Sequence, residues 1–415
     1  MSQEAGKRLA VVGAGIVGAC CALALQRQGC EVVLVDRLEP GEGCSKGNAG
    51  HIAIEHASPV ATPATLRGVA GMLMQKNGPL SLHWASLPSL MPWIGRFLWA
   101  ARPAQVARGS QGLAALNAGA MAAFEELAKQ AGFRDLLVRK GTLMVAESRK
   151  GLDSLLGEAK HAEAFGVRSE ILTGDDLRSL EPALSERLIG GVHYPDAAFV
   201  TDPHAVVRRV FETFAAAGGR FERMDIRGVR QIRGGWRLEG DDGALEAEGC
   251  VIAAGAYSAR LAAPLGYRIP LASGRGYHYT AFDAKLQPGR PIGSADQRFL
   301  VTPMQMGLRI AGRLELGSPD APMKEAHARK LLPLAQRLLP GLEEGEYGLW
   351  MGRRPMLPDS LPVIDRAPHH PGLFFAFGHH HLGLTQAPIT ARLIADLAAG
   401  RSPGLDLAPY RVDRF

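Results

Sequence analysis

The clearest pattern of apolar and polar positions lies near the start of the chain. Residues 9–12 form a short apolar run, residues 19–28 place apolar side chains at helical spacing, and residues 31–35 form a second, β-branched run. Two parallel strands need a crossover between them, and strands buried on both faces are apolar throughout. The pattern therefore predicts a strand, a helix and a second, parallel strand.

Three glycines follow the first strand in the spacing GxGxxG, at Gly13, Gly15 and Gly18. Gly13 allows a tight turn, Gly15 lets a pyrophosphate reach the backbone, and Gly18 lets the helix pack on the strand. The helix start offers unpaired N–H groups to phosphate, and Asp36 ends the second strand, where it can accept both hydroxyls of a ribose. Together these features predict a site for an ADP-containing dinucleotide. The residues of this site are Gly13, Ala14, Gly15, Ile16, Val17, Gly18, Asp36 and Arg37.

The remaining pattern alternates strands with helices and then becomes rich in hairpins. The predicted strands are residues 141–146, 190–200, 220–226, 229–232, 236–238, 244–247, 271–280, 299–303, 308–312 and 373–377. The predicted helices are residues 113–131, 152–165, 203–217, 331–339 and 387–397. This order indicates an α/β unit combined with a second unit that contains an antiparallel sheet.

The composition is that of an ordinary globular protein of 415 residues, long enough for two domains with sizeable cores. The net charge is +6, but the basic residues are scattered, which argues against nucleic-acid binding and suits an anionic cofactor and a carboxylate substrate. The five cysteines fit neither a disulfide framework nor a zinc spacing. Lys7 and Arg8 precede an apolar run as in a signal peptide, but the glycines account for that run better, so we expect a cytoplasmic protein.

The loop after the second strand carries the first resemblance to a known family. Its run CSKGNAGH, residues 44–51, resembles the second cofactor loop of the D-amino-acid oxidase/dehydrogenase family of FAD enzymes, where bacterial D-amino-acid dehydrogenases carry Ser-x-x-Asn-Ala-Gly. In the family this loop passes the pyrophosphate and runs along the isoalloxazine ring. The resemblance implies phosphate contact for Ser45, and flavin contact for Asn48, Ala49, Gly50 and His51.

Three later motifs extend the resemblance over essentially the whole chain. VIAAGAYS at 251–258 resembles the segment that ends the adenine-binding half, and WMGRRPMLPDSLPVI at 350–364 resembles G-x-R-P-x-(T/S)-P-D-G-x-P-(V/I)-I. GHHHLGLT at 378–385 resembles G-H-x-x-x-G-x-(T/S), which begins a helix facing the flavin pyrimidine, and its ending resembles the branch associated with hydroxy-D-proline oxidation. The cofactor contacts that these motifs add are Ile226, Ala254, Gly255, Leu382, Gly383, Leu384 and Thr385.

The resemblance implies an α/β fold in which a Rossmann-like FAD-binding domain is interleaved with an α+β substrate domain carrying an antiparallel sheet. We assign residues 1–56, 201–268 and 347–415 to the FAD-binding domain, and residues 57–200 and 269–346 to the substrate domain.

Residues 79–102 are apolar, but Pro88 and Pro92 interrupt them, which is not typical of a plain transmembrane helix. The segment holds three of the five tryptophans, Trp84, Trp93 and Trp99. One interpretation is a helical layer of the substrate domain. The alternative is a peripheral contact with the inner membrane, through which electrons would pass to a quinone or the respiratory chain.

Arg354, in the Arg-Pro pair of the second late motif, is the candidate for binding the substrate carboxylate. A guanidinium binds a carboxylate through two parallel hydrogen bonds and so fixes its orientation. Its neighbour Arg353 is the alternative. His51 follows the Ala-Gly pair of the cofactor loop and is predicted to reach the substrate amine, or else to be an ordinary loop histidine.

Tyr277 and Tyr279 are alternate residues of one strand and therefore share a face, while His278 faces the opposite side. We predict that the tyrosines point into the substrate pocket, with packing in the core as the alternative. His379 and His381 would share one face of an extended segment and His380 the other. No further ligand cluster is evident in the sequence, so no metal site is predicted.

These features predict an FAD-dependent enzyme that oxidises the amine carbon of a D-amino or D-imino acid, such as hydroxy-D-proline. Hydride passes to flavin N5 and an imine is formed, so no side-chain nucleophile is needed. Two alternatives remain: an NAD(P)-dependent dehydrogenase, and a flavin-binding subunit of a heteromeric dehydrogenase.

Overall fold

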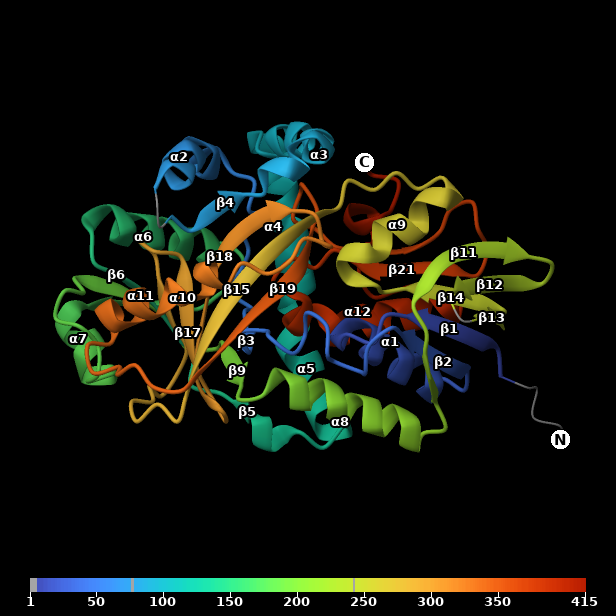
Figure 1. Cartoon of the computed structure of the whole chain (residues 1–415), viewed down its shortest axis with the longest axis horizontal. Coiled ribbons are helices and arrows are strands. Elements are labelled where there is room, and N and C mark those ends of the chain that lie inside the picture. The colour runs from blue at the N-terminus through green and yellow to red at the C-terminus, as the bar shows by residue number, and fades with distance from the viewer. Residues whose placement is uncertain (1–5, 76–77, 242) are drawn as a thin grey trace.

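The computed structural model describes residues 6–75, 78–241 and 243–415, and two large sheets lie beside each other along its long axis (Figure 1). One sheet has six strands in the order β10-β2-β1-β14-β21-β20. They are β1 (Arg8–Val12), β2 (Glu31–Asp36), β10 (Arg220–Arg223), β14 (Gly249–Ile252), β20 (Val363–Arg366) and β21 (Leu373–Phe377). All neighbours run parallel except β20 and β21. Helix α1 (Ile16–Arg27) connects β1 to β2, which confirms the predicted βαβ unit.

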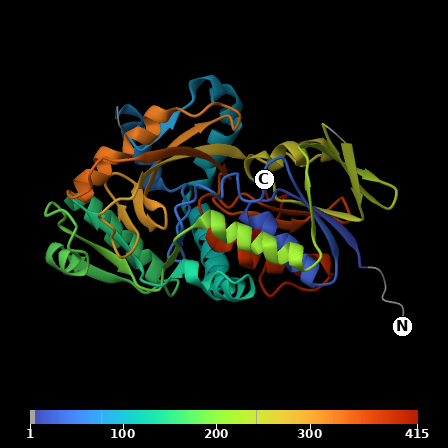
Figure 2. The ribbon, with the colours of Figure 1, turned by 60° about the horizontal axis from the view of Figure 1, so that its bottom comes forward.

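Alternate residues of β1 face opposite sides of the six-stranded sheet, and each side has its own apolar core. Leu9 and Val11 pack among helices on one face, whereas Ala10 and Val12 pack against a small sheet on the other. The helices of the first face are α1, α5 (Ala120–Gln130), α8 (Pro203–Ala216) and α12 (Gly383–Ala398). The opposite face carries β11 (Ile226–Ile232), β12 (Gly235–Gly240), β13 (Gly243–Ala247) and α9 (Ser258–Ala262). Figure 2 shows these two layers on either side of the sheet.

The second large sheet has nine strands, in the order β19-β15-β18-β17-β16-β6-β8-β7, with β4 paired to β18. They are β4 (Leu80–Leu82), β6 (Thr142–Ala146), β7 (Glu170–Thr173), β8 (Gly190–Tyr194), β15 (Ala272–Phe282), β16 (Ile292–Ser294), β17 (Phe299–Met304), β18 (Gly307–Gly317) and β19 (Tyr347–Met356). Most pairs are antiparallel, as predicted for the substrate domain. The helices that pack against this sheet are α6 (Arg149–Glu163), α7 (Gly174–Leu180), α10 (Glu325–Arg329) and α11 (Leu331–Leu338).

A short third sheet, ordered β3-β9-β5, holds the end of the predicted cofactor loop beside α12. Its strands are β3 (His51–Ile52), β5 (Leu137–Val138) and β9 (Ala198–Val200). The Ala53 N–H donates to Thr385 Oγ1 at 3.0 Å, which ties the residues after β3 to the first turn of α12. Two motifs that lie more than 300 positions apart are thereby brought together.

Residues 79–102 form β4, a single 3₁₀ turn and helix α3 (Leu87–Ala100), near α2 (Pro63–Met74) and α4 (Pro103–Ala118). Trp93 is buried and its Nε1–H donates to the Met356 carbonyl at 2.9 Å, whereas Trp84 and Trp99 are exposed. The tryptophans therefore divide between packing and surface. Within the ranges that the structure describes, no helix has the length and apolar character needed to cross a membrane.

Several boundaries differ from the sequence-based expectation. The helix predicted over 113–131 begins earlier, at Pro103, and is divided at Gly119 into α4 and α5, at a position where a Cβ would lie 3.2 Å from Ile389 Cδ1 of α12. The domain assignment also placed residue 347 onward in the FAD-binding domain. Strand β19 instead pairs along its length with β15 and is part of the nine-stranded sheet.

Candidate functional site

A cavity of about 350 Å³ follows the carboxyl ends of β1, β2, β14 and β21 and continues to the start of α12. Ligands of open parallel sheets bind at this edge, where strand order reverses. The predicted cofactor residues that line it are Gly13, Gly15, Ile16, Val17, Asp36, Arg37, Ser45, Asn48, Ile226, Ala254, Gly255, Gly383 and Leu384. One cavity thus borders the central βαβ unit and all four motifs. The motif at 350–364 lines it through Gly352, Arg353 and Pro355.

The glycines of the first turn have distinct roles in the structure. Gly13 has φ +109°, and a Cβ there would lie 2.4 Å from the Ala253 carbonyl oxygen. A Cβ on Gly18 would lie 1.7 Å from the Gly13 oxygen, so only glycine lets the helix approach the strand. At Gly15 the nearest atom to such a Cβ is Ser45 Oγ at 3.3 Å, on the side that faces the cavity. Gly15 therefore leaves space for a ligand rather than for protein packing.

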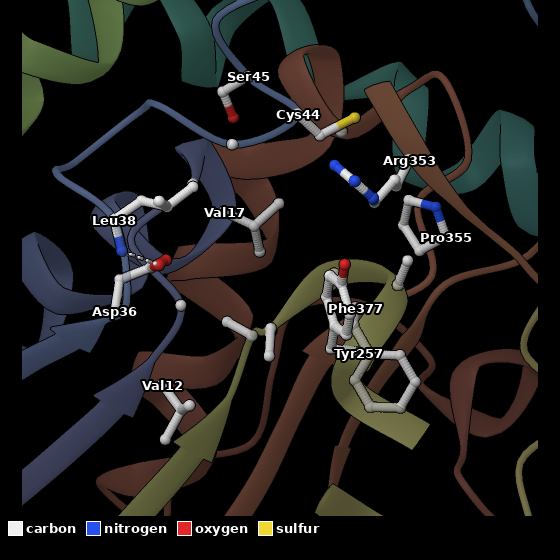
Figure 3. A pocket seen from close by; sticks show the side chains of 18 of the residues that line it. Val12, Val17, Asp36, Leu38, Cys44, Ser45, Tyr257, Arg353, Pro355 and Phe377 are labelled. Atoms are coloured by element: carbon white, nitrogen blue, oxygen red, sulfur yellow. Dashed lines mark hydrogen bonds between the residues drawn. The ribbon is translucent and has the colours of Figure 1, made fainter. Parts of the chain in front are cut away.

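Asp36 is held at the end of β2 by two backbone donors, of which Figure 3 shows Leu38. Its Oδ2 accepts from the Ala14 N–H at 2.7 Å and its Oδ1 from the Leu38 N–H at 3.0 Å. Burial raises the pKa of this carboxyl, although the same hydrogen bonds oppose the rise. The neighbouring Arg37 guanidinium lies 4.2 Å from the centre of the Tyr257 ring. Asp36 is thus oriented to accept ribose hydroxyls. Tyr257, which belongs to the VIAAGAYS motif but was not among the predicted cofactor contacts, lines the cavity.

The loop between Cys44 and Gly50 crosses the start of α1. Ser45 Oγ accepts from the Ile16 N–H at 2.9 Å, so it lies where the helix N-terminus would meet phosphate. The Asn48 side chain accepts from the Gly50 N–H at 2.8 Å and fixes the turn that leads into β3. Arg309 of β18 binds the loop, because its Nη1 donates to the Asn48 carbonyl at 2.6 Å. Burial lowers the pKa of Arg309 to about 10.

The three histidines before α12 have three different partners. His379 Nε2 lies 3.0 Å from Thr390 Oγ1, and His380 Nε2 lies 2.9 Å from the Leu357 N. His381 Nε2 lies 3.1 Å from His56 Nδ1. The predicted alternation of faces is wrong because His380 has φ +51°, which ends the extended backbone. Gly383 and Leu384 line the cavity, whereas Leu382 and Thr385 are buried behind it.

Arg354 and Arg353 point to opposite faces of β19. The side chain of Arg354 lies over Gly276, where a Cβ would be 2.4 Å from its Cζ. Among the residues that the structure describes, no carboxylate is within ion-pair distance of Arg354, and burial lowers the pKa of its guanidinium. Arg353 lines the cavity opposite Asp36 and its Nε donates to the Pro319 carbonyl (Figure 3). Arg354 is thus a partly buried cation without a carboxylate partner in the described part of the chain, and it is Arg353, not Arg354, that lines the cavity.

The tyrosines of β15 do not face the cavity, and the prediction that they point into a substrate pocket is wrong. Tyr277 donates to Glu315 Oε2 at 2.7 Å and Tyr279 stacks on Tyr347, both within the core beneath α10 and α11. Strand alternation turns His278 the other way. The ring of His278 lies 3.1 Å from the Gly47 carbonyl and stacks on Trp350. His278, the residue between the two tyrosines, is therefore the one that faces the cofactor loop.

His51 belongs to a cluster that the sequence motifs did not reveal. Its Nε2 lies 3.0 Å from both Glu55 Oε1 and Thr142 Oγ1. Glu55 and His56 follow in the loop after β3, and their spacing carries no motif that would have marked them. Contact between His51 and the substrate amine stays a prediction, since Glu55 and Thr142 both lie beside the same ring nitrogen, Nε2.

The residues of the cavity suit FAD. The N-cap residue of α1, Gly15, has no side chain, and Ser45 Oγ accepts from the Ile16 N–H at this helix start. Asp36 is oriented by two N–H groups, and residues from Ile226 to Leu384 line one cavity, as a dinucleotide requires. The second helix N-terminus, at α12, lies at the other end of this lining, and its N-cap residue Leu382 makes no side-chain cap hydrogen bond. Its positive dipole end favours the side of a flavin on which negative charge develops.

Comparison with known proteins agrees with this geometry. The family model described as DAO, FAD dependent oxidoreductase, matches residues 8–397. The chain is 32% identical to a D-amino-acid oxidase of Bradyrhizobium diazoefficiens over 99% of both proteins, and 30% identical to a D-amino acid dehydrogenase of Xylella fastidiosa over 98% of this chain and 96% of that protein.

Solved structures show the same fold at lower identity. The glycine oxidase of Geobacillus kaustophilus superposes with a TM-score of 0.76 at 24% identity, covering 99% of both chains. The iminodiacetate oxidase of Chelativorans sp. BNC1 superposes with a TM-score of 0.73 at 22% identity, covering 97% of this chain and 98% of that one. With the dinucleotide turn, the oriented Asp36 and a cofactor loop that meets a second helix N-terminus, the chain belongs to the DAO family of FAD-dependent oxidoreductases.

Proposed function

We propose that this flavoenzyme oxidises the amine carbon of a D-amino or D-imino acid and that Arg354 binds the substrate carboxylate. The observation that carries the proposal is a partly buried guanidinium, near the cofactor loop, with no carboxylate partner among the described residues. Burying a charge is costly unless it is paired, so such a site favours an anionic ligand. Bound FAD supplies the hydride acceptor, and the protein supplies orientation and electrostatics.

The strand pairing around Arg354 also supports its proposed role in binding the carboxylate. Gly274 and Gly276 of β15 lie opposite Arg354 and Gly352 of β19, and these small residues leave room for the guanidinium and for Trp350. The relatives named D-amino-acid oxidase and D-amino acid dehydrogenase favour an α-amino acid of D configuration. The ending HHLGLT favours a cyclic imino acid such as hydroxy-D-proline as the narrower substrate.

The test is anaerobic bleaching of the flavin by a panel of D- and L-amino acids that includes the hydroxyprolines. Rapid bleaching by D-amino or D-imino acids is the expected result, followed by appearance of the keto acid or cyclic imine. Bleaching only by L-enantiomers would reverse the stereochemical assignment. Turnover by the isolated chain would exclude the alternative, a flavin-binding subunit that needs a partner. Membership of an FAD family already removes the NAD(P)-dependent alternative.

We also propose that electrons leave for a quinone at a membrane surface bound through α2 and α3. Trp84, Met91, Leu98 and Trp99 are exposed there, with Trp84 at 72%. No Asp or Glu occurs between Glu55 and Glu125, although several arginines do. Exposed aromatic and apolar side chains in a cationic surface suit an anionic lipid bilayer.

Sedimentation with phosphatidylglycerol vesicles tests this contact. The double variant Trp84→Ser/Trp99→Ser should lose binding, while Ile171→Ser, which removes an exposed apolar side chain of β7, should bind as the parent does. Trp93 is unsuitable for the test because it is buried. Equal sedimentation of parent and double variant would contradict the contact. Peroxide formation as fast as dye reduction would contradict the quinone acceptor.

A further inference from the structure

Four polar side chains form a connected chain in the region between the cofactor loop and α12. Glu55 Oε1 lies 3.0 Å from His51 Nε2 and 3.7 Å from His56 Nε2. His56 Nδ1 in turn lies 3.1 Å from Nε2 of His381. Glu55 is buried, and its second oxygen has no hydrogen-bond partner among the described residues. His381, at the other end, is accessible to solvent. The chain therefore runs from a buried carboxylate to an accessible imidazole.

The carboxylate decides which nitrogen of each ring carries the proton. Glu55 favours a proton on His56 Nε2, so the other nitrogen of a neutral His56 is an acceptor. In that tautomer, Nδ1 of His56 would accept the hydrogen bond from His381 Nε2–H across the 3.1 Å contact. His381 Nδ1 is then left with a lone pair. Partial removal from water, together with neighbouring positive charges, lowers the pKa of both His56 and His381, so both rings are neutral near pH 7 and each keeps a nitrogen lone pair.

The histidine chain lies next to the cavity, because His379, His380 and Gly383, which flank His381 in the sequence, line it. The charge of Arg354 contributes to lowering the pKa of His381. The His51 and His56 charges act on His381 in the same sense. In contrast, Glu55 opposes the lowering of the pKa of His56 and would stabilise a proton on that ring. The titratable or charged side chains facing the chain from surrounding elements are His51, Glu158, Tyr194, Arg354 and His380.

We propose that His381 accepts the proton of the substrate ammonium group and passes it to His56, where Glu55 stabilises the resulting imidazolium. This inference rests on the proposed amino-acid oxidation. An ammonium nitrogen has no free electron pair, so it must lose a proton before a C=N bond can form. The proton moves from the substrate nitrogen to His381 Nδ1, and the proton of His381 Nε2 moves to His56 Nδ1. With FAD bound as the hydride acceptor, the electron pair released on nitrogen would form the C=N bond as the hydride leaves Cα.

In this scheme His381 is a catalytic residue, and Glu55 and His56 are positioning residues that act through it. A carboxylate bound by Arg354 would hold the amine on the side of the histidines, which separates the two charged groups of one amino acid. General-base catalysis contributes roughly 10²- to 10⁴-fold to a rate. Loss of this base should therefore lower the rate of flavin reduction most at neutral pH, where little of the substrate is in the free amine form.

The experiment is the rate of anaerobic flavin reduction by saturating substrate between pH 6 and pH 10. We expect His381→Gln and Glu55→Gln to slow reduction by roughly 10²-fold near pH 7, with the loss shrinking as the pH approaches the pKa of the amine. Apparent substrate affinity should change little. Added imidazole should partly restore the rate of His381→Ala, an effect that a merely structural role would not produce.

His161→Gln is the matched control, because His161 is a histidine of the same half of the molecule whose Nε2 lies 3.1 Å from Ser110 Oγ. It should follow the parent at every pH. FAD content and melting temperature identify any variant that misfolds, and the isosteric Glu55→Gln then decides the matter. Variants with the pH profile of the parent would overturn the relay alone. A parent flavin that no amino or imino acid reduces at any pH would overturn the proposed function, and the relay with it.

Discussion

Arg353 and Arg354 are adjacent and chemically identical, yet they meet different surroundings. Successive residues of a strand face opposite sides of the sheet. Arg354 therefore lies over Gly276 on the face that carries His278 and Trp350, while Arg353 reaches the Pro319 carbonyl at the wall of the cavity. The same alternation buries Tyr277 with Glu315 and turns His278 toward Gly47.

Arg354→Lys should slow flavin reduction by roughly tenfold to a hundredfold, which corresponds to about 1.4–2.8 kcal/mol. A lysine keeps the charge but loses the two parallel hydrogen bonds that orient a carboxylate. Anaerobic stopped-flow reduction measures the effect. FAD content should stay near that of the parent, and amino-acid amides, which lack the carboxylate charge, should lose much less.

Arg353→Lys is the control for Arg354→Lys, since it makes the same change one residue away. It should alter reduction far less, because Arg353 at the wall of the cavity donates to the Pro319 carbonyl, whereas Arg354 has no carboxylate partner among the described residues. If Arg353→Lys is the slower variant, the carboxylate is bound at the wall of the cavity and the assignment to Arg354 is wrong.

The three glycines of the turn between β1 and α1 have different structural roles. Gly13 and Gly18 are glycine because the protein backbone approaches them, at 2.4 Å and 1.7 Å from the Cβ that another residue would carry. Gly15 is open toward the cavity except for Ser45. Helix α12 likewise begins at Gly383, earlier than the predicted residue 387, so its first turn carries the residues of the last motif despite Pro388 inside it.

A pair of alanine variants separates these roles. Gly15→Ala should fold but bind FAD more weakly, because its methyl group occupies space for the pyrophosphate and meets only a movable hydroxyl. Gly18→Ala should lower the melting temperature of the apoprotein, since the Gly13 carbonyl must move. FAD fluorescence titration and apoprotein melting measure the two effects. Equal FAD affinity of parent and Gly15→Ala would contradict the assignment of the phosphate site.

Several histidines across the molecule are removed from water by the packing around them. Burial lowers the pKa of His278 and His379 to about 3, and of His327 and His380 to about 4. An unfolded histidine has a pKa near 6.5. Between these values the unfolded chain binds protons that the folded protein does not, so the free energy of unfolding falls as the pH falls.

Each such histidine should remove up to about 1.4 kcal/mol of stability per pH unit below about pH 6.5, until its folded pKa is reached. His379→Gln removes one of these groups from the interior. Urea unfolding at pH 7.5 and pH 5.5 should therefore show a smaller loss of stability for the variant than for the parent, by about 1.4 kcal/mol. An equal loss in both proteins would show that His379 is protonated in the folded state.

Local chemistry in the sequence was sufficient for the cofactor half of the site. A glycine turn, an acidic residue at a strand end and a helix start act through backbone geometry within some 30 residues, and the structure places Gly13, Gly15 and Asp36 along one cavity as expected. The later motifs were recognisable by resemblance, and the strands and helices around them form close to their predicted bounds. Such features depend on short-range spacing, which a sequence displays directly.

Contacts between distant segments could not be read in the same way. The faces of Tyr277 and His278 depend on which side of β15 the cofactor loop occupies, and alternation alone does not say which. Gly119, where α4 and α5 are divided, lies against Ile389 of α12, and β19 belongs to the larger sheet because it pairs with β15. The chain from Glu55 to His381 links residues that are hundreds of positions apart, with no periodicity to mark them. These properties arise when the sheets and helices pack, because packing selects which of the locally possible neighbours meet.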